Sequence, residues 1–361
     1  MKIKTSTPGR ICLFGEHQDY LKLPVIAAAI SKRVSIEGVR NSTRKISISL
    51  PDINSCEEFE ITEKIPYIKE RDYLRSSFNV LLRNGFTFSY GLECIVKGNI
   101  PVNTGTSSSS ALIASWINLL ALMSDQEKEL SSFEIARYAY ISEVEEFGEP
   151  GGMMDHYSTS IGGVIYLCTE PEIKIEKLNS VPGTFILGNS QEPKDTKNIL
   201  ARVKHGVLNI ISKLRENYPE FSLNGITTES FYNYENVLTV DESELLYGTV
   251  INKTITEKAK ELLSKKDPDR KEIGLLLNEH QEVLRDYLKI STSKIDRMIN
   301  AALDAGAYGG KINGSGGGGC MFAYAPDNPE KVLRAVKLIA PDSHIVHFDE
   351  GTRVDYYGGD E

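Results

Sequence analysis

A run of glycine, threonine and serine between an apolar strand and an apolar helix constrains this sequence more than any other feature. The run covers residues 101–111 (PVNTGTSSSSA); residues 91–96 before it predict a strand, and residues 111–123 after it predict a helix. A loop that leads from a strand into a helix offers several backbone N–H groups and the positive end of the helix dipole. The pattern favours a polyphosphate site, although serines before a helix also suit an ordinary capping loop.

Two common nucleotide-binding fingerprints do not explain this run. The P-loop requires GxxxxGK followed by Ser or Thr, and the Gly310-Lys311 pair is followed by Ile312. Residues 314–319 (GSGGGG) satisfy GxGxxG, but residues 320–324 after them predict a strand where a dinucleotide-binding fold requires a helix. The sequence therefore disfavours both classes.

The rest of the chain predicts a mixed α+β fold in two lobes. Apolar strand patterns dominate up to about residue 65. Further strands are predicted at residues 91–96, 164–167, 185–187, 320–325 and 344–348, and helices at 70–84, 111–123, 132–146, 195–217, 256–265, 270–288, 293–305 and 329–339. A polar stretch at residues 189–197 predicts the boundary between an N-terminal domain (1–190) and a C-terminal domain (191–361).

Composition narrows the class of partner. The net charge of −9 comes from acidic and basic residues mixed along the chain, without the basic cluster that nucleic acid or an anionic membrane requires. Five scattered cysteines, none in a CxxC pair, indicate neither a disulfide framework nor a zinc site. With no signal-peptide core and no apolar run of about 20 residues, we expect a cytoplasmic monomer or homodimer that acts on a small molecule, without nucleic-acid or membrane partners.

Three separated segments carry a family resemblance. Residues 8–20 (PGRICLFGEHQDY) contain an intact GEHxDY motif, and residues 311–320 (KINGSGGGGC) form a glycine-rich motif. Between them, the run at 101–111 follows P-x3-G-L-[GS]-S-S-S/A, with Thr106 in the Leu position and Ser107 in the Gly/Ser position. In this order the segments resemble those of the GHMP small-molecule kinases, and GEHxDY resembles the galactokinase signature.

The resemblance implies a fold and two ligands. GHMP kinases have an N-terminal lobe like ribosomal protein S5 and a ferredoxin-like C-terminal lobe, with ATP and the acceptor in the cleft between them. ATP and Mg²⁺ are therefore the expected cofactors.

The resemblance also assigns catalytic roles. Residues 150–155 (PGGMMD), with Glu143 before them, resemble the Glu…P-x-G-x-x-D arrangement of the galactokinase group. Asp155 would be the general base for the acceptor hydroxyl, or at least orient it. Arg10 would keep Asp155 ionised and counter the charge that develops on the γ-phosphate.

Phosphate and metal contacts follow from the same comparison. Ser109 and Glu143 would be the Mg²⁺ ligands, with Ser108 as a close competitor of Ser109. The residues that would bind the ATP phosphates are Gly105, Thr106, Ser107, Ser108, Ser109 and Ser110. Gly314, Gly316 and Gly317 would allow a close approach of backbone beside that loop.

A cluster of polar residues predicts the acceptor. Glu16, His17 and Asp19 follow an apolar strand within four residues, which suits a polyol with several hydroxyls. The matching galactokinase residues contact the sugar, so the resemblance implies a monosaccharide, phosphorylated at its anomeric hydroxyl, with Asp155 also in contact with it. Residues 21–24 (LKLP) depart from the Asn-Gly-Gly that usually follows the signature, which leaves the identity of the sugar open.

Two alternatives stay open. Residues 13–17 and 311–320 match mevalonate kinase as well as galactokinase, so mevalonate kinase or another GHMP kinase is the competing enzyme. Asp19 and Tyr20 argue against it, because mevalonate kinases typically carry apolar residues there. A non-catalytic sensor that binds sugar and ATP is the alternative of another class, and the retained Arg10 and Asp155 disfavour it.

Overall fold

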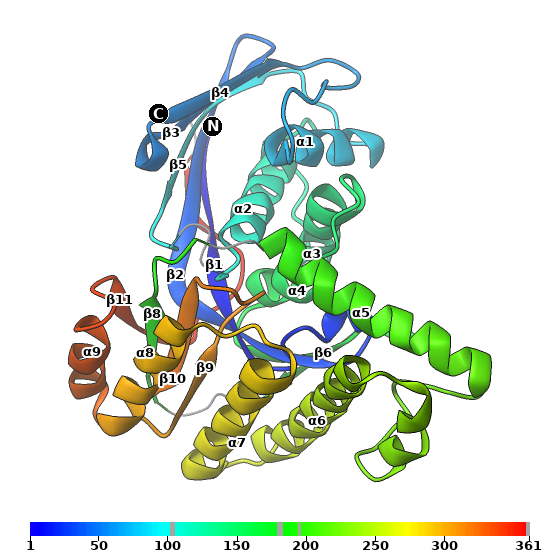
Figure 1. The fold of residues 1–361 in the computed structure, drawn as a ribbon. Coiled ribbons are helices and arrows are strands. Elements are labelled where there is room, and N and C mark those ends of the chain that lie inside the picture. Colours follow the sequence, from blue (N-terminus) through cyan, green and yellow to red (C-terminus); the bar gives the residue numbers. More distant parts are fainter. Residues whose placement is uncertain (102–104, 179–182, 194–195, 359–361) are drawn as a thin grey trace.

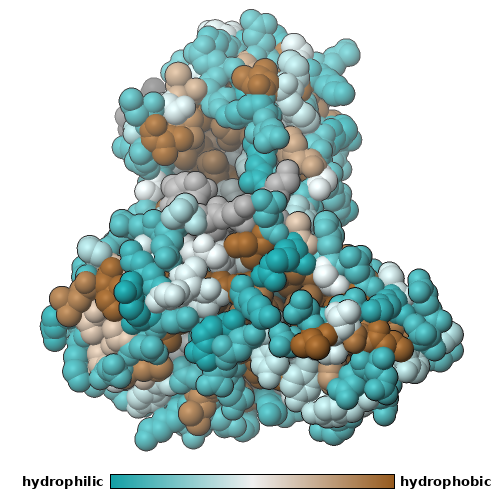
Figure 2. Space-filling view, in the orientation of Figure 1, coloured by the Kyte–Doolittle hydropathy of each residue, from teal (hydrophilic) through white to brown (hydrophobic). Residues whose placement is uncertain are grey.

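The structure is a computed structural model that describes residues 1–101, 105–178, 183–193 and 196–358. It confirms the α+β class, because two sheets and several helices occupy these residues (Figure 1). Among the described residues, no helix combines the length and the apolar character that crossing a membrane requires. Hydrophilic side chains cover most of the face that Figure 2 shows, and apolar ones form small separate patches.

The larger sheet runs in the order β12-β1-β2-β5-β3-β4, with β6 paired to β2 and β7 paired to β6. Its strands are β1 (Lys2–Phe14), β2 (Val25–Asn41), β3 (Lys45–Leu50), β4 (Ser55–Glu60), β5 (Gly91–Gly98), β6 (Val164–Cys168), β7 (Lys174–Leu178) and β12 (Arg353–Gly358). The smaller sheet has the order β11-β8-β10-β9. Its strands are β8 (Phe185–Asn189), β9 (Gly309–Ile312), β10 (Cys320–Tyr324) and β11 (Ser343–Val346).

One group of helices lies with the larger sheet (Figure 1). With the larger sheet lie α1 (Tyr73–Arg83), α2 (Ser108–Met123), α3 (Ser132–Tyr140) and α4 (Met154–Ile161). The later helices are α5 (Thr196–Asn217), α6 (Val240–Leu263), α7 (Arg270–Glu282), α8 (Ser293–Asp304) and α9 (Pro329–Lys337). Single π-helical turns at Ile141–Glu145 and Val283–Tyr287 extend α3 and α7.

Helix α2 lies at the centre of the N-terminal lobe because it is apolar on every side. Its Trp116 is completely buried and donates to the Leu74 carbonyl of α1 at 3.0 Å. Helix α2 begins at Ser108, so its first turn contains the last serines of the run at residues 101–111. The predicted order of strand, loop and helix is therefore confirmed, although Val102, Asn103 and Thr104 of the run lie outside the described residues.

Strand β1 contributes to both lobes. Ile3 packs in the core of the N-terminal lobe with α2, whereas Ile11 and Phe14 pack in the other large core with residues of the smaller sheet such as Phe185. The middle and end of β1 therefore lie where the lobes meet.

Some elements of the secondary structure differ from the predictions. The helix predicted at 256–265 is the end of α6, which begins at Val240 and is capped by Thr239 and Glu242 in a reciprocal capping box. Glycine and β-branched residues obscure its first half in the sequence, but burial of that half overrides these propensities. Helix α4 and strands β4, β7, β9 and β12 were not predicted individually.

The domain boundary near residue 190 stays a prediction. Strand β8 precedes that residue and pairs with β10 and β11 in the smaller sheet. Strand β12, far after it, pairs with β1 in the larger sheet. Sheet membership therefore does not change at a single point of the chain.

A buried histidine joins α7 to β1. His280 is completely buried and stacks on Phe14, with ring centroids 6.0 Å apart. Burial, together with the positive charge of Lys311, holds the pKa of His280 well below its ordinary value. The folded protein thus keeps this imidazole neutral, whereas the unfolded chain protonates it below about pH 6.5. Because the unfolded state binds more protons, His280 lowers the free energy of unfolding as the pH falls.

The free energy of unfolding of the wild-type protein should fall between pH 7 and pH 5. In His280→Gln we expect this fall to be about 2 kcal/mol smaller. Denaturant titrations at a series of pH values, followed by circular dichroism, measure this difference. His347→Gln, at an exposed position, is the control for the substitution of a histidine by glutamine. Equal slopes for His280→Gln and the wild-type protein would contradict the assignment.

Candidate active site

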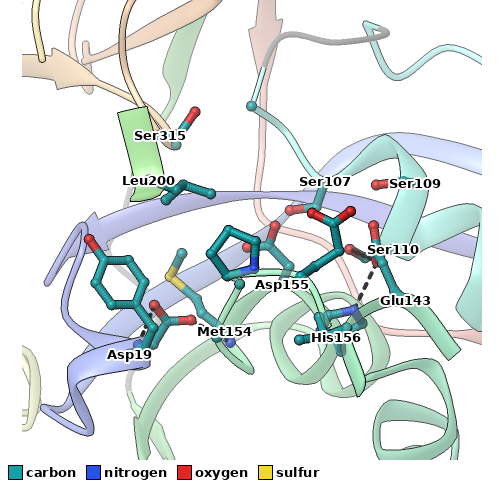
Figure 3. A pocket seen from close by; sticks show the side chains of 18 of the residues that line it. Asp19, Ser107, Ser109, Ser110, Glu143, Met154, Asp155, His156, Leu200 and Ser315 are labelled. Atoms are coloured by element: carbon teal, nitrogen blue, oxygen red, sulfur yellow. Dashed lines mark hydrogen bonds and ion pairs between the residues drawn. The ribbon is translucent and has the colours of Figure 1, made fainter. Parts of the chain in front are cut away.

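A cavity of about 250 Å³ lies among the end of β1, the start of α2, the turn before α4 and the glycine motif after β9. The predicted site residues that line it are Arg10, Glu16, His17, Asp19, Gly105, Ser107, Ser108, Ser109, Ser110, Glu143, Asp155 and Gly314. Figure 3 shows Asp19 and Met154 at one end, Ser109, Ser110 and Glu143 at the other, and Asp155 between them. We call these the Asp19 end and the serine end.

The centre of the cavity holds an ion pair between β1 and α4. Arg10 Nε and Nη2 donate to Asp155 Oδ1 at 2.8 and 2.5 Å, and Arg10 is 3% exposed. Burial opposes ionisation of Asp155, but Arg10, His156 and Ser107 outweigh it and hold the pKa of Asp155 below its ordinary value. About a third of the Asp155 side chain, 33%, stays exposed. Asp155 is therefore a charged acceptor of hydrogen bonds that a ligand can reach.

Glu143 lies at the serine end, in the π-helical turn after α3. Its Oε2 accepts hydrogen bonds from Ser110 Oγ at 2.7 Å and from His156 Nε2 at 2.8 Å (Figure 3). Burial works against the carboxylate, but hydrogen bonds from His156, Ser109 and Ser110 hold the pKa of Glu143 below its ordinary value. His156 orients this carboxylate.

The donor set at the serine end fits Mg²⁺ with a polyphosphate. It offers carboxylate and hydroxyl oxygens, the ligands that Mg²⁺ prefers. In the part of the chain that the structure describes, no three His, Cys, Asp or Glu side chains gather as a metal-binding group. A cation held there by Glu143 would therefore complete its coordination with hydroxyls, water and phosphate oxygens, which is typical of Mg²⁺ in kinases.

The first motif is fixed to the glycine motif. Glu16 accepts from Lys311 Nζ through one carboxylate oxygen and from the Gly314 N–H through the other, both at 2.6 Å. His17 contacts Tyr20 Oη through Nδ1 at 2.6 Å and the Ser315 carbonyl through Nε2 at 3.0 Å. Both side chains hold the cavity wall together, and their contact with an acceptor stays a prediction.

Asp19 presents its carboxylate at the other end of the cavity. Its Oδ2 accepts from the Met154 N–H at 3.1 Å and its Oδ1 from the Tyr20 N–H at 2.9 Å. Burial raises the pKa of Asp19, and the negative charge of Asp155 adds to the increase. A Cβ at Gly152 would lie 2.0 Å from Asp19 Oδ2, so this position must be glycine while Asp19 keeps its place.

Three predicted residues lie behind the cavity wall. Thr106 is buried, and its carbonyl accepts from the Arg10 N–H at 3.1 Å. A Cβ on Gly316 would lie 2.5 Å from Ile290 Cβ, and one on Gly317 would lie 2.1 Å from Ile199 Cδ1. These glycines thus permit close packing behind the motif, and direct phosphate contacts of the three residues stay predictions.

Other lining residues were missed in the sequence. Arg71 donates to both carboxylate oxygens of Glu149 at 2.8 and 2.7 Å, and Tyr73 lies beside them at the start of α1. Leu200 of α5 and Ser315 also line the cavity. Arg71 and Leu200 belong to no motif, and only the fold brings them to the cavity.

Comparison with known proteins agrees with this geometry. The sequence-family model of the GHMP kinases N-terminal domain matches residues 72–163. The family model of the GHMP kinases C-terminal domain matches residues 259–340. A galactokinase galactose-binding signature matches residues 3–38. All three models overlap elements that surround the cavity.

Related proteins extend the match over most of the chain. Mevalonate kinase from Pyrococcus furiosus is 30% identical, covering 98% of this chain and 99% of its own. Galactokinase from Actinobacillus succinogenes is 25% identical, covering 91% and 86%. The crystal structure of Lactococcus lactis galactokinase complexed with galactose shares the fold, with a TM-score of 0.85 at 20% identity, covering 98% of this chain and 95% of that one. The chain therefore belongs to the GHMP kinases, a family of ATP-dependent kinases.

Proposed function

We propose that this protein transfers the γ-phosphoryl group of ATP to an uncharged monosaccharide, at the anomeric hydroxyl that the galactokinase resemblance implies. The observation that carries the proposal is the charge of the cavity. Its described lining contains two arginines, Arg10 and Arg71, and each is already paired with a carboxylate, Asp155 or Glu149.

The Asp19 end favours a neutral acceptor. An acceptor with a carboxylate would meet Asp19 and Asp155 there, and like charges at short range in a partly dehydrated cavity repel each other. A polyol instead brings hydroxyl donors, which carboxylates accept well. Hydroxyl groups therefore match this end better than an anionic group does.

Phosphoryl transfer needs positioning and neutralisation of charge more than covalent chemistry. Asp155 would accept a hydrogen bond from the acceptor hydroxyl and take or orient its proton, while Arg10 keeps Asp155 ionised. The start of α2 and its serines would hold the phosphates. Glu143, with Ser109 or Ser110, would hold Mg²⁺, which supplies positive charge beside the phosphates.

Mevalonate kinase is the second candidate. The 30% identity to the Pyrococcus furiosus enzyme over nearly the whole chain favours it. Mevalonate carries a carboxylate, whereas a neutral sugar does not. The charge of the acceptor therefore distinguishes the two candidates.

Turnover of different acceptors tests the proposal. We expect ADP release with at least one neutral hexose or heptose, and at least about tenfold lower kcat/KM for mevalonate and for uronic acids, because these lack a cationic partner in the cavity. A coupled ADP assay over these compounds measures the difference. Preferred turnover of mevalonate would support the second candidate, and no turnover of any sugar would refute the first.

Replacement of the proposed base separates chemistry from binding. Asp155→Asn should lower kcat by about a hundredfold or more while leaving the protein folded, because the amide cannot accept the hydroxyl proton. Asp349→Asn is the matched control, since Asp349 pairs with Arg33 at 2.9 Å outside the cavity. Steady-state kinetics with thermal unfolding compare the two variants. Near wild-type turnover in Asp155→Asn would remove Asp155 from the mechanism.

Acidification should affect binding before chemistry. The pKa of Asp19 is raised and that of Asp155 is lowered, so Asp19 takes up its proton at the higher pH. We expect the KM for the acceptor to rise first on acidification, and kcat to fall only at lower pH. Asp19→Asn should show a high acceptor KM throughout, without this pH dependence. A simultaneous change of kcat and KM in the wild-type protein would argue against separate roles.

A further inference from the structure

The glycine motif contains a side chain that reaches the phosphate loop from behind. Asn313 follows β9 and is completely buried, and it does not line the cavity. Its Oδ1 accepts from the Cys12 N–H of β1 at 2.8 Å, and its Nδ2 donates to the Gly105 carbonyl at 2.7 Å. One carboxamide thus connects all three segments on which the family resemblance depends.

We propose that Asn313 is a positioning residue that sets the backbone of the phosphate loop for nucleotide binding. The inference rests on the proposed function, because the loop is taken to bind ATP. Asn313 would act through Gly105, without touching the nucleotide.

Two successive carbonyls of the loop point back toward β1. The Gly105 carbonyl accepts from Arg10 Nη1 as well as from Asn313, and the Thr106 carbonyl accepts from the Arg10 N–H at 3.1 Å. In a trans peptide the C=O and N–H groups point in opposite directions. The N–H groups of the same two peptides, on Thr106 and Ser107, are therefore directed away from β1.

The loop needs this external support because its conformation is unusual. Gly105 and Ser107 have φ angles of +83° and +60°, in the left-handed region, and for serine that region carries an energetic cost. No helix or strand includes residues 105–107. Among the described residues, the side chains of Arg10 and Asn313 fix the orientation of the Gly105 peptide, and Asn313 has no second role at Asp155.

A single substitution can change the contact with Gly105 while it keeps the contact with Cys12. Asn313→Asp keeps an oxygen to accept from the Cys12 N–H but replaces the donor to Gly105 with a second acceptor, so it repels that carbonyl. Asn79→Asp is the matched control. Asn79 is 3% exposed in α1, accepts from the Ile65 N–H at 2.8 Å and donates to the Ile65 carbonyl at 2.8 Å.

Calorimetric titration tests the proposal directly. The probe is the magnesium complex of a non-hydrolysable ATP analogue, added to the wild-type protein and to both variants. We expect about a tenfold loss of affinity in Asn313→Asp, the effect of one lost hydrogen bond to a loop that binds an anion, and an unchanged affinity in Asn79→Asp. Steady-state kinetics should show a raised KM for ATP and an unchanged KM for the acceptor.

The outcomes separate this inference from the proposed function. Unchanged analogue affinity in Asn313→Asp, or an equal loss for analogue and acceptor, would overturn the positioning role, since the second result indicates general damage. If Asn313→Asp does not fold, Asn313→Ser, which is too short to reach Gly105, takes its place with the same expected result. A wild-type protein that binds the analogue but phosphorylates no acceptor would refute the proposed function and leave the titration decisive for Asn313.

Discussion

The arrangement of the cavity depends on a buried ion pair between the two lobes. Lys311 and Glu16 are 2.6 Å apart, and their side chains are 0% and 1% exposed. A buried pair is tolerated only when its remaining hydrogen-bonding capacity is used. Here Lys311 also donates to the Cys12 and Ile312 carbonyls, and Glu16 also accepts from the Gly314 N–H. These contacts fix the end of β1 relative to the glycine motif. Arg10 of β1 and Asn313 of that motif both contact the phosphate loop from these fixed positions.

Local patterns in the sequence were enough for much of the fold and for membership of the family. Strand β5, the loop and α2 follow in the predicted order, because apolar periodicity and a glycine-rich break are local signals. Pairing is not local. The sequence did not show that Glu16 pairs with Lys311, because the two lie 295 residues apart and no pattern near Glu16 indicates a buried cation. For the same reason the sequence could not show that β8 joins the smaller sheet or β12 the larger one.

Sequence motifs located the main residues of the site, but not the direction of each side chain. Arg10, Glu143 and Asp155 lie in motifs, and the fold brings all three to one cavity. Ser109 is the predicted serine ligand, and its hydroxyl and that of Ser110, which lies 2.7 Å from Glu143, both hydrogen-bond to this carboxylate. The side chains of neighbouring residues differ in direction by about 100° around α2. Motif spacing cannot resolve such a rotation. Their roles as metal ligands stay predictions.

Strand β12 has a consequence for how the molecule is assembled during synthesis. It pairs with β1 from Lys2 opposite Gly358 to Ser6 opposite Arg353, so one edge of β1 is completed by a segment that is synthesised much later. Until the ribosome releases that segment, β1 keeps an open edge, and open strand edges attract other chains. Contacts between residues so distant in sequence also form slowly. The nascent chain therefore exposes this edge of β1 until β12 is available to pair with it.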